Sequence, residues 1–488
     1  MKDTGLRRYA LVSVTLSNFL TPFMASAIYI ALPSIAADFK MDAVLLSWVA
    51  TSFTLASVAS MVPCGRISDI FGRKKMFLLG YIIFTIASLL CGLSGSPTML
   101  ILFRVFQGIG GAMIFVQGPA ILLSVFPPHE RGRVLGISVA AVFAGLSLGP
   151  LIGGVMTTAL SWRSVFLMIG PLGLIVVWLM LWKLKEEWVD ARGEKFDIIG
   201  SVIYVLAIVI FIYGITHLPT LRSFWLVVIG LIGFFCFIKW EMHVESPVFE
   251  INLFRNNRLF ALSNLAALIH FSGSFAVTFL MSLYLQSIKG LSPQGAGVIL
   301  VLQTIVQAIF SPYAGKLSDR IEPGIVAAVG MAVTTLGICA FIFLDEASSL
   351  TFILVNLALL GLGIALFSSP NSNALLSSVE RKYYGQASGS SSTMRQFGMI
   401  LSMGIVTLLF NLFIGRVEIT ADVYPAFIRS LKATFSVFSV LCFVGIFASL
   451  ARGKMHSYSH TIGDSAGMIS QSAEEPQPQG ESSSKLSS

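Results

Sequence analysis

Charged residues are scarce in this sequence. Asp, Glu, Lys and Arg together make up 11% of its 488 residues, whereas soluble domains carry about 25%. Hydrophobic residues make up 55%, and the mean hydropathy is +0.84. A composition this apolar excludes an ordinary water-soluble domain and predicts an integral membrane protein that crosses the bilayer many times.

The patterns of metal, redox and enzyme sites are also missing. The five cysteines lie far apart in apolar segments without a C-x-x-C, so we expect neither disulfides nor a metal site. No H-E-x-x-H, G-x-S-x-G or phosphate-binding loop occurs, so we expect no enzyme and no cofactor. The net charge of +8 does not indicate a nucleic-acid partner, because the positive residues are spread over short loops.

Acidic residues are absent from the apolar segments. About fourteen segments are long enough to cross the lipid bilayer as helices of about 20 residues, and all 24 Asp and Glu residues fall outside them. The predicted spans lie near 9–33, 43–64, 76–95, 98–124, 134–158, 162–183, 198–217, 223–240, 259–287, 294–315, 324–344, 350–371, 387–413 and 431–451.

Lys and Arg are distributed unequally between alternate loops. With the N-terminus inside, 23 of the 32 lie in inner loops and tails and 7 in outer loops, and only Arg104 and Arg395 lie within spans. The positive-inside rule therefore predicts a multi-pass plasma-membrane protein with both termini in the cytoplasm.

A short motif recurs in the two halves of the chain. Gly65 to Lys75 reads GRISDIFGRKK after the second predicted span, and Gly315 to Arg320 reads GKLSDR after the tenth. Parallel repeats of this kind place a substrate site between two bundles near the middle of the membrane. The repetition predicts an all-α fold of two six-helix bundles with two inserted helices.

The boundaries of these parts follow from the spans. We expect a first bundle at 1–183, a linker with the two extra helices at 184–258, and a second bundle at 259–454. Within the linker, residues 241–257 are amphipathic and are expected to lie on the membrane surface. Residues 455–488 are rich in Ser, Gln, Glu and Pro, which predicts a disordered cytoplasmic tail.

Glycines concentrate in the fifth predicted span, whose sequence GISVAAVFAGLSLGPLIGG carries no charge. A glycine costs roughly 1 kcal/mol in a helix interior relative to alanine, but in lipid small residues let helices pack closely. We therefore expect a bendable, tightly packed helix whose contacts depend on Gly145, Gly149, Pro150, Gly153 and Gly154.

Taken together, these motifs resemble those of the major facilitator superfamily. The spacing G-x8-G-x3-G-P-x2-G-G resembles the fifth-helix motif of its exporters, and Gly65, Asp69, Gly72 and Arg73 resemble its loop motif between helices 2 and 3. Ser161-Trp162-Arg163 and the phrases ALPSIA, YLQSIKGLSPQGAG and MRQFG resemble its fourteen-helix drug:proton antiporter branch. The resemblance implies alternating access between two rocking bundles.

The loop motif is expected to act as a gate. Asp69 at a helix end can make charge-assisted hydrogen bonds to cationic side chains and so hold neighbouring helices together. The sequence departs from the family at Ile70, where Arg is usual, and the second copy keeps Asp319 and Arg320 but loses the following Gly-Arg.

Arg104, His270 and Arg395 are the ionisable groups that we expect inside the membrane. Arg104 and Gln107 belong to RVFQGIGG, which resembles the family's fourth-helix motif and implies a role in proton coupling; the alternative is a structural arginine bonded to first-span groups such as Asn18. His270 can carry the coupled proton or be a neutral histidine bonded to a neighbouring helix. Arg395 is an anion contact or an interhelical hydrogen-bond donor.

Several uncharged polar residues share helix faces with these groups. Gln303 and Gln307 stand one turn apart in the tenth span, and Asn18 and Tyr29 belong to one stripe of the first. They line the substrate cavity or act as packing contacts between helices, because one helical spacing fits both roles.

We therefore expect a transporter that exports small amphipathic compounds, with the proton gradient as the energy source implied by the resemblance. A dehydrated cation needs a carboxylate partner, and the spans offer none, so neutral or anionic substrates are favoured. The lack of carboxylates also argues against ordinary proton coupling. The alternatives are an importer or facilitator of an organic anion or metabolite, and a membrane sensor or scaffold with a transporter fold.

Overall fold

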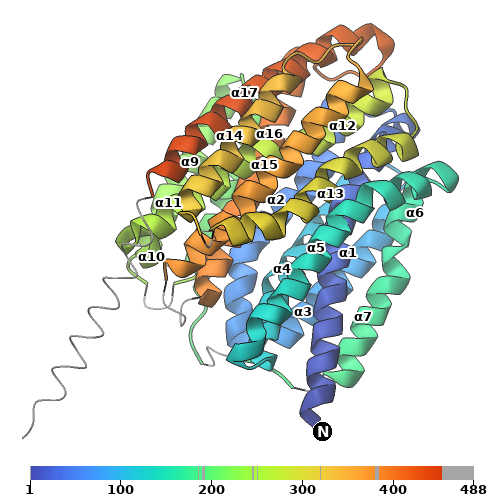
Figure 1. Cartoon of the computed structure of the whole chain (residues 1–488). Helices are drawn as coiled ribbons and strands as arrows, with labels where there is room; N and C mark the ends of the chain where they lie inside the picture. Colours follow the sequence, from blue (N-terminus) through green and yellow to red (C-terminus); the bar gives the residue numbers. More distant parts are fainter. Residues whose placement is uncertain are drawn as a thin grey trace, which may run out of the picture.

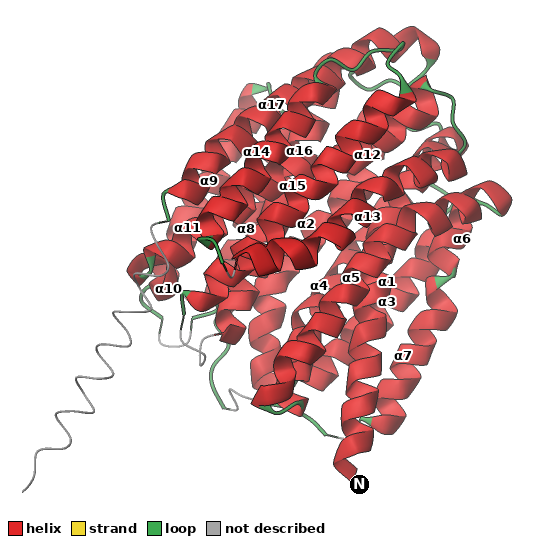
Figure 2. Cartoon of the chain, viewed as in Figure 1, coloured by secondary structure: helices red, strands yellow, loops and turns green. Residues whose placement is uncertain are grey.

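The protein is helical throughout the part of the chain that the computed structural model describes, and no strand occurs there (Figure 2). The described residues are 2–184, 186–189, 193–244, 247–249, 251–318, 320–379 and 384–452. Within them, 14 helical segments are long and apolar enough to cross a membrane. The expected all-α architecture with fourteen spans is confirmed.

The first six spans form one group of helices, blue to teal in Figure 1. The sixth span consists of two consecutive helices that meet at Met168. The helices of this group are α1 (Lys2–Phe39), α2 (Ala43–Phe71), α3 (Arg73–Gly92), α4 (Pro97–Val125), α5 (Pro128–Ala159), α6 (Trp162–Leu167) and α7 (Ile169–Lys183).

The remaining helices comprise an inserted pair and a second group of six spans, yellow to red in Figure 1. The inserted pair is α8 (Ile198–Thr216) and α9 (Leu221–Glu241), followed by the short α10 (Ile251–Asn256). The second group is α11 (Arg258–Ser274), α12 (Val277–Leu283), the π-helical turn η1 (Tyr284–Ile288), α13 (Pro293–Ser318), α14 (Pro323–Phe341), α15 (Leu350–Ser377), α16 (Tyr384–Phe413), the 3-10 turn η3 (Ala421–Val423) and α17 (Tyr424–Leu450).

Helix starts follow ordinary capping chemistry. The carboxylate of Asp42 accepts from the backbone N–H of Leu45 at 2.7 Å and caps α2. Asn257 caps α11 and Ser349 caps α15 in the same way. These side chains satisfy backbone donors that the first helical turn leaves without partners.

The helices extend beyond several predicted spans, which corrects the sequence-based boundaries. The first helix runs from Lys2 to Phe39, where 9–33 was expected, and the second continues to Phe71. The extensions place Asp38, Asp69 and Glu241 inside helices, each within the last turn. A span predicted from hydropathy ends at the first charged residue, whereas the helix itself continues into the polar interface.

The position of residues 241–257 on the membrane surface stays a prediction, but their contacts with the bundle are defined. Among the described residues, the apolar side chains of Val248 and Phe249 pack against Tyr204 and Phe237 of the inserted pair. Phe254 packs against Phe260 at the start of α11. These described apolar side chains therefore pack on the protein bundle.

The inserted helix α8 bridges the two groups. Tyr204 donates a hydrogen bond to the Val58 carbonyl of α2 at 3.0 Å, and its ring contacts Phe397 of α16. Ile208 and Ile212 share a buried cluster with α2 and α16. The extra pair is therefore packed into the side of the molecule where α2 and α16 meet. The predicted tail, 455–488, lies outside the described residues.

Candidate functional site

The two six-span groups meet most closely at the end of the bundle opposite the N-terminus, which we call the far end. There the N–H of Ala43, the first residue of α2, donates to the carbonyl of Val417 in the α16–α17 loop at 3.0 Å. One turn deeper, the hydroxyls of Ser47 and Thr407 lie 2.9 Å apart. The halves are thus joined by direct hydrogen bonds on the α2–α16 side.

Glycines of α5 pack closely against the backbones of α1 and α13. A Cβ at Gly153 would lie 2.8 Å from the Cβ of Ala27 in α1, and one at Gly145 would overlap the Phe19 carbonyl. Gly154 faces the other half, where a Cβ would lie 2.7 Å from the Pro293 carbonyl at the start of α13. The glycine face predicted for the fifth span therefore packs against α1 and also against the second group.

Packing between α5 and α13 loosens toward the N-terminal end. Along the side of α13 that begins at Gly297, burial falls from Gly297 through half-buried Val301 to exposed Ala308. On α5 it falls from buried Pro150 to exposed Gly136, where an added Cβ would meet no atom within 4 Å. The halves are closed at the far end and diverge toward the other end.

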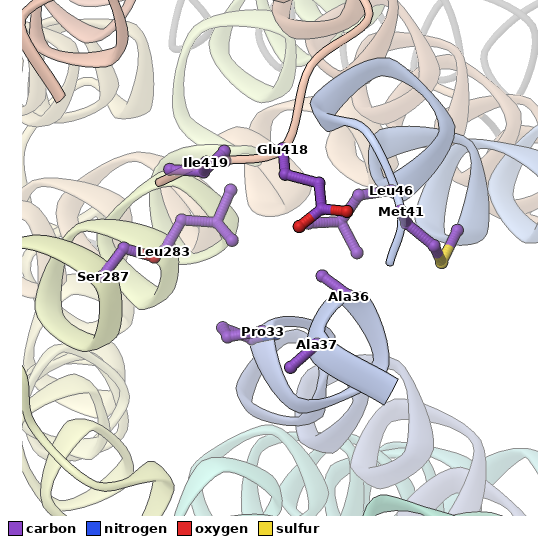
Figure 3. Close-up of a pocket in the computed structure, with 9 residues that line it drawn as sticks. All are labelled: Pro33, Ala36, Ala37, Met41, Leu46, Leu283, Ser287, Glu418 and Ile419. Atoms are coloured by element: carbon purple, nitrogen blue, oxygen red, sulfur yellow. The ribbon is translucent and has the colours of Figure 1, made fainter. Parts of the chain in front are cut away.

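A depression marks the closed seam at the far end (Figure 3). It encloses about 530 Å³ of empty space, including space open to solvent. The carboxylate of Glu418 points into it from the α16–α17 loop (Figure 3). The lining residues come from both halves: Pro33, Ala36, Ala37, Met41, Leu46, Leu283, Ser287, Glu418 and Ile419.

Arg104 is enclosed in the first group, at 1% exposure. Its Nε donates to the Val49 carbonyl at 3.0 Å, and one terminal nitrogen donates to Gln107 Oε1 at 2.5 Å. Gln107 in turn donates to Ser88 Oγ at 2.7 Å, and the guanidinium lies 4.4 Å from the centre of the Phe53 ring. The network links α2, α3 and α4 and satisfies the arginine locally.

Asn18 is not a partner of Arg104. Its amide donates to Ser138 Oγ on α5, so it joins α1 to the glycine-rich helix. Tyr29 is 6% exposed and its ring lies edge-on to Phe275 and Phe279 of the second group. Tyr29 therefore belongs to the far-end seam between the halves.

His270 is fully buried in the second group. Its ring stacks on Phe367 of α15 with centroids 4.0 Å apart, and within the described residues neither ring nitrogen has a hydrogen-bond partner. One turn later on the same helix, Ser274 donates its hydroxyl to the His270 carbonyl at 2.8 Å. The imidazole is thus a polar group held between two apolar surfaces.

Arg395 lies half-buried near the middle of α16. One terminal nitrogen donates to Ser392 Oγ at 3.1 Å, and that hydroxyl is its one hydrogen-bond partner in the described part of the chain. Gln303 and Gln307 are 6% and 8% exposed, and α15 packs against their helix at Gly361, where a Cβ would overlap the Gln303 carbonyl. Their role in the cavity stays a prediction.

The loop motif lies at the N-terminal end and is internally paired. Asp69 and Arg73 form an ion pair of 3.0 Å, and Arg73 also donates to Ser124 at the end of α4 at 2.8 Å. Gly72, with φ of +120°, adopts a left-handed conformation that favours glycine. Gly65 lies beside Val116, and a Cβ added at Gly65 would lie 3.4 Å from Val116 Cγ1.

The linker after α7 is bound to this motif. The carboxylate of Glu187 accepts from the backbone N–H of Lys74 at 2.8 Å, and the Trp188 carbonyl accepts from that of Arg73 at 3.0 Å. Glu194 forms an ion pair with Arg66. In the second copy, Asp319 lies outside the described residues and Arg320 is exposed.

Comparison with known proteins decides the family. The sequence matches the profile described as Major Facilitator Superfamily over residues 14–259 and 263–474. The chain belongs to the Major Facilitator Superfamily. The fold is similar to the crystal structure of a bacterial homolog to the human lysosomal transporter Spinster in an inward-facing and unoccupied conformation. The two structures superpose with a TM-score of 0.67 at 17% identity, covering 92% of this chain and 97% of that one. That likeness supports the superfamily fold.

Several superfamily relatives have names that state a transported compound. Riboflavin transporter RibZ of Clostridioides difficile (strain 630) is 28% identical over 436 residues, which cover 89% of this chain and 95% of that protein. The tetracenomycin C resistance and export protein of Streptomyces glaucescens is 28% identical over 423 residues, covering 85% and 77%. The Major Facilitator chain described here is therefore a multi-pass membrane transporter.

Sequence reasoning missed the polar residues of the far-end seam. Ser47, Thr407, Ser282 and Gln286 join the two halves, but each is an isolated polar residue in an apolar helix. Glu187 was missed because it lies in a linker without a recognisable pattern. The one available signal was Pro33 in ALPSIA, since a proline inside a helix releases a carbonyl.

Proposed function

We propose that the protein is a plasma-membrane exporter of small amphipathic compounds, neutral or anionic, driven by proton antiport through alternating access. Both termini lie in the cytoplasm in this proposal, as the excess of Lys and Arg in the loops at the N-terminal end supports. The far end is then the outer end, and the structure represents a state closed to the outside.

The surroundings of Arg395 are the main support for the proposed substrate class. A half-buried guanidinium with one neutral hydroxyl partner is a favourable contact for an anionic group. In the described helices every Asp and Glu lies within a few residues of a helix end, so the middle of the bundle offers no carboxylate to a cation. Unpaired cations are expected to be rejected there because desolvation is costly.

The direction and the energy source have separate support. Export is supported by the fifth-helix motif and by relatives named for multidrug resistance and export. Proton coupling is supported by the family resemblance and by His270, because histidine is the side-chain type whose ordinary pKa lies closest to physiological pH. Asp69 is the second candidate for a proton carrier.

A second candidate is an importer or facilitator of an organic anion or metabolite. It is favoured by the coverage of 89% and 95% in the match to a protein named as a riboflavin transporter. Under this alternative, the lack of carboxylates in the middle of the spans reflects transport without a proton cycle.

Transport in vesicles of known orientation tests both candidates. Inverted vesicles should accumulate an anionic or neutral amphipathic dye when the vesicle interior is made more acidic than the medium. A protonophore should stop the accumulation. A matched cationic dye should be transported at least about tenfold more slowly. Accumulation only in right-side-out vesicles, or insensitivity to the protonophore, would favour the importer or facilitator.

A further inference from the structure

Pro33 leaves a backbone carbonyl of α1 without a helical donor. Proline has no N–H, so the carbonyl four residues earlier, that of Tyr29, cannot make its usual intrahelical hydrogen bond. Tyr29 is 6% exposed and packed against Phe275 and Phe279. A buried carbonyl without a donor is unfavourable, so the surrounding structure must provide one.

The donor comes from the other half of the molecule. Ser282 of α12, which is fully buried, donates its hydroxyl to the Tyr29 carbonyl at 2.7 Å. Gln286, one turn later, donates to Ser282 Oγ at 3.0 Å and to the Ile30 carbonyl at 3.1 Å. The two side chains and the two carbonyls form a continuous hydrogen-bonded cluster across the seam.

The local backbone supports this placement. The helix changes from α to π at Tyr284–Ile288, so Gln286 lies within a π-helical turn. Single π-helical turns of this kind occur frequently at functional sites. Here the turn lies where α12 meets α1, beside the far-end depression lined by Pro33 and Leu283.

We propose that the Tyr29 carbonyl, Ser282 and Gln286 form the hydrogen-bonded gate that holds the far end shut, and that Pro33 makes that carbonyl available. The inference rests on the proposed alternating access. When α1 and α12 separate, the Tyr29 carbonyl loses its donor and must turn to entering water. These are positioning residues: they set the balance between closed and open states and need not touch the substrate.

The gate is testable by chemical accessibility in the full chain. Leu283, 1% exposed and lining the depression, is replaced by cysteine after the native cysteines are replaced by alanine. A membrane-impermeant maleimide is then added from outside to right-side-out vesicles, and the labelling rate is measured. The native cysteines are Cys64, Cys91, Cys236, Cys339 and Cys442.

Ser282→Ala should raise the labelling rate about fivefold, since one buried hydrogen bond holds the closed state by roughly that factor. Ser282→Thr keeps the hydroxyl and should restore the parental rate. Ser287→Ala is the matched control, because Ser287 lies in the following turn, also lines the depression and makes no hydrogen bond among the described residues; it should leave the rate unchanged.

A double-mutant cycle tests the role of Pro33. In Pro33→Ala the alanine N–H can bond the Tyr29 carbonyl, so Ser282→Ala should then change the labelling rate by less than about twofold. Equal effects of Ser282→Ala with and without Pro33 would overturn the assignment, as would an effect of Ser287→Ala as large as that of Ser282→Ala.

This experiment needs no substrate, so it separates the two proposals. If the labelling pattern is as expected but vesicles transport none of the dyes, the proposed function fails and the gate stands. If the dyes are exported but labelling is the same in all variants, the gate fails and the function stands. Labelling from the opposite face of the membrane alone would overturn the proposed orientation.

Discussion

The ionisable groups buried in the two halves of the molecule differ in how many hydrogen bonds they make. In the first group of helices, Arg104 is bonded to Val49 and Gln107, and Gln107 to Ser88. In the second group, both nitrogens of His270 lack partners among the described residues, and Arg395 has one hydroxyl. The Arg104 network is bonded internally, whereas His270 and Arg395 have hydrogen-bonding capacity left over.

This difference leads us to expect different roles for the Arg104 network and for His270 and Arg395. A satisfied network resists rearrangement because each member holds the next in place. Unsatisfied polar groups in a buried site are costly unless a ligand, a water or a proton supplies the missing interaction. We therefore expect substitutions in the Arg104 network to affect folding, and those at His270 and Arg395 to affect substrate and proton handling.

The largest effect is expected at Gly149. A Cβ there would lie 2.8 Å from the Phe23 carbonyl and even closer to Ser26 Oγ, so Gly149→Leu should separate α5 from α1 and abolish transport. Gly136→Leu on the same helix is the control, because Gly136 is exposed and an added Cβ there meets no atom within 4 Å. Vesicle transport and membrane insertion are measured together; full activity of Gly149→Leu would refute close packing there.

Substitutions of Arg104 and Arg395 allow a direct comparison of the two halves. Arg104→Ala should lower the free energy of unfolding by about 2–3 kcal/mol, because charged hydrogen bonds are lost from a buried network, and Arg104→Lys should not restore it, since lysine lacks the planar fork. Arg395→Ala should leave thermal stability within about 0.5 kcal/mol and reduce transport of an anionic dye about tenfold more than that of a neutral analogue. Equal losses for both dyes would indicate a structural role for Arg395.

His270 tests whether the unsatisfied imidazole handles protons. His270→Gln keeps a polar side chain of similar size but cannot titrate, so the part of the pH dependence of transport that comes from proton binding at His270 should be lost. His217 at the far end is the control, because its Nδ1 already lies 3.0 Å from the Tyr213 carbonyl. A pH profile unchanged in His270→Gln would remove His270 as the proton carrier and leave Asp69.

How far the sequence predicted this molecule depends on the kind of signal. The fourteen spans were predictable because each is a long apolar run, and their ends were not, since Asp38 and Asp69 lie in helical turns beyond those runs. The glycine face of α5 was predictable from spacing. The seam was not, because Ser282 and Gln286 act on a carbonyl supplied by a different helix, and no local pattern reports such a pairing.

The smallest effect is expected at the linker, where a carboxylate accepts from the start of a helix of the first group. Glu187 accepts from the Lys74 N–H and caps the start of α3, so Glu187→Ala should destabilise the protein by about 1 kcal/mol. Glu186→Ala is the matched control, because Glu186 is exposed and makes no hydrogen bond among the described residues. Thermal unfolding in detergent at low and high salt measures both, and salt should reduce the difference, since the dipole contribution is screened. If the contact between Glu187 and α3 does not stabilise the protein, the two variants will unfold at the same temperature.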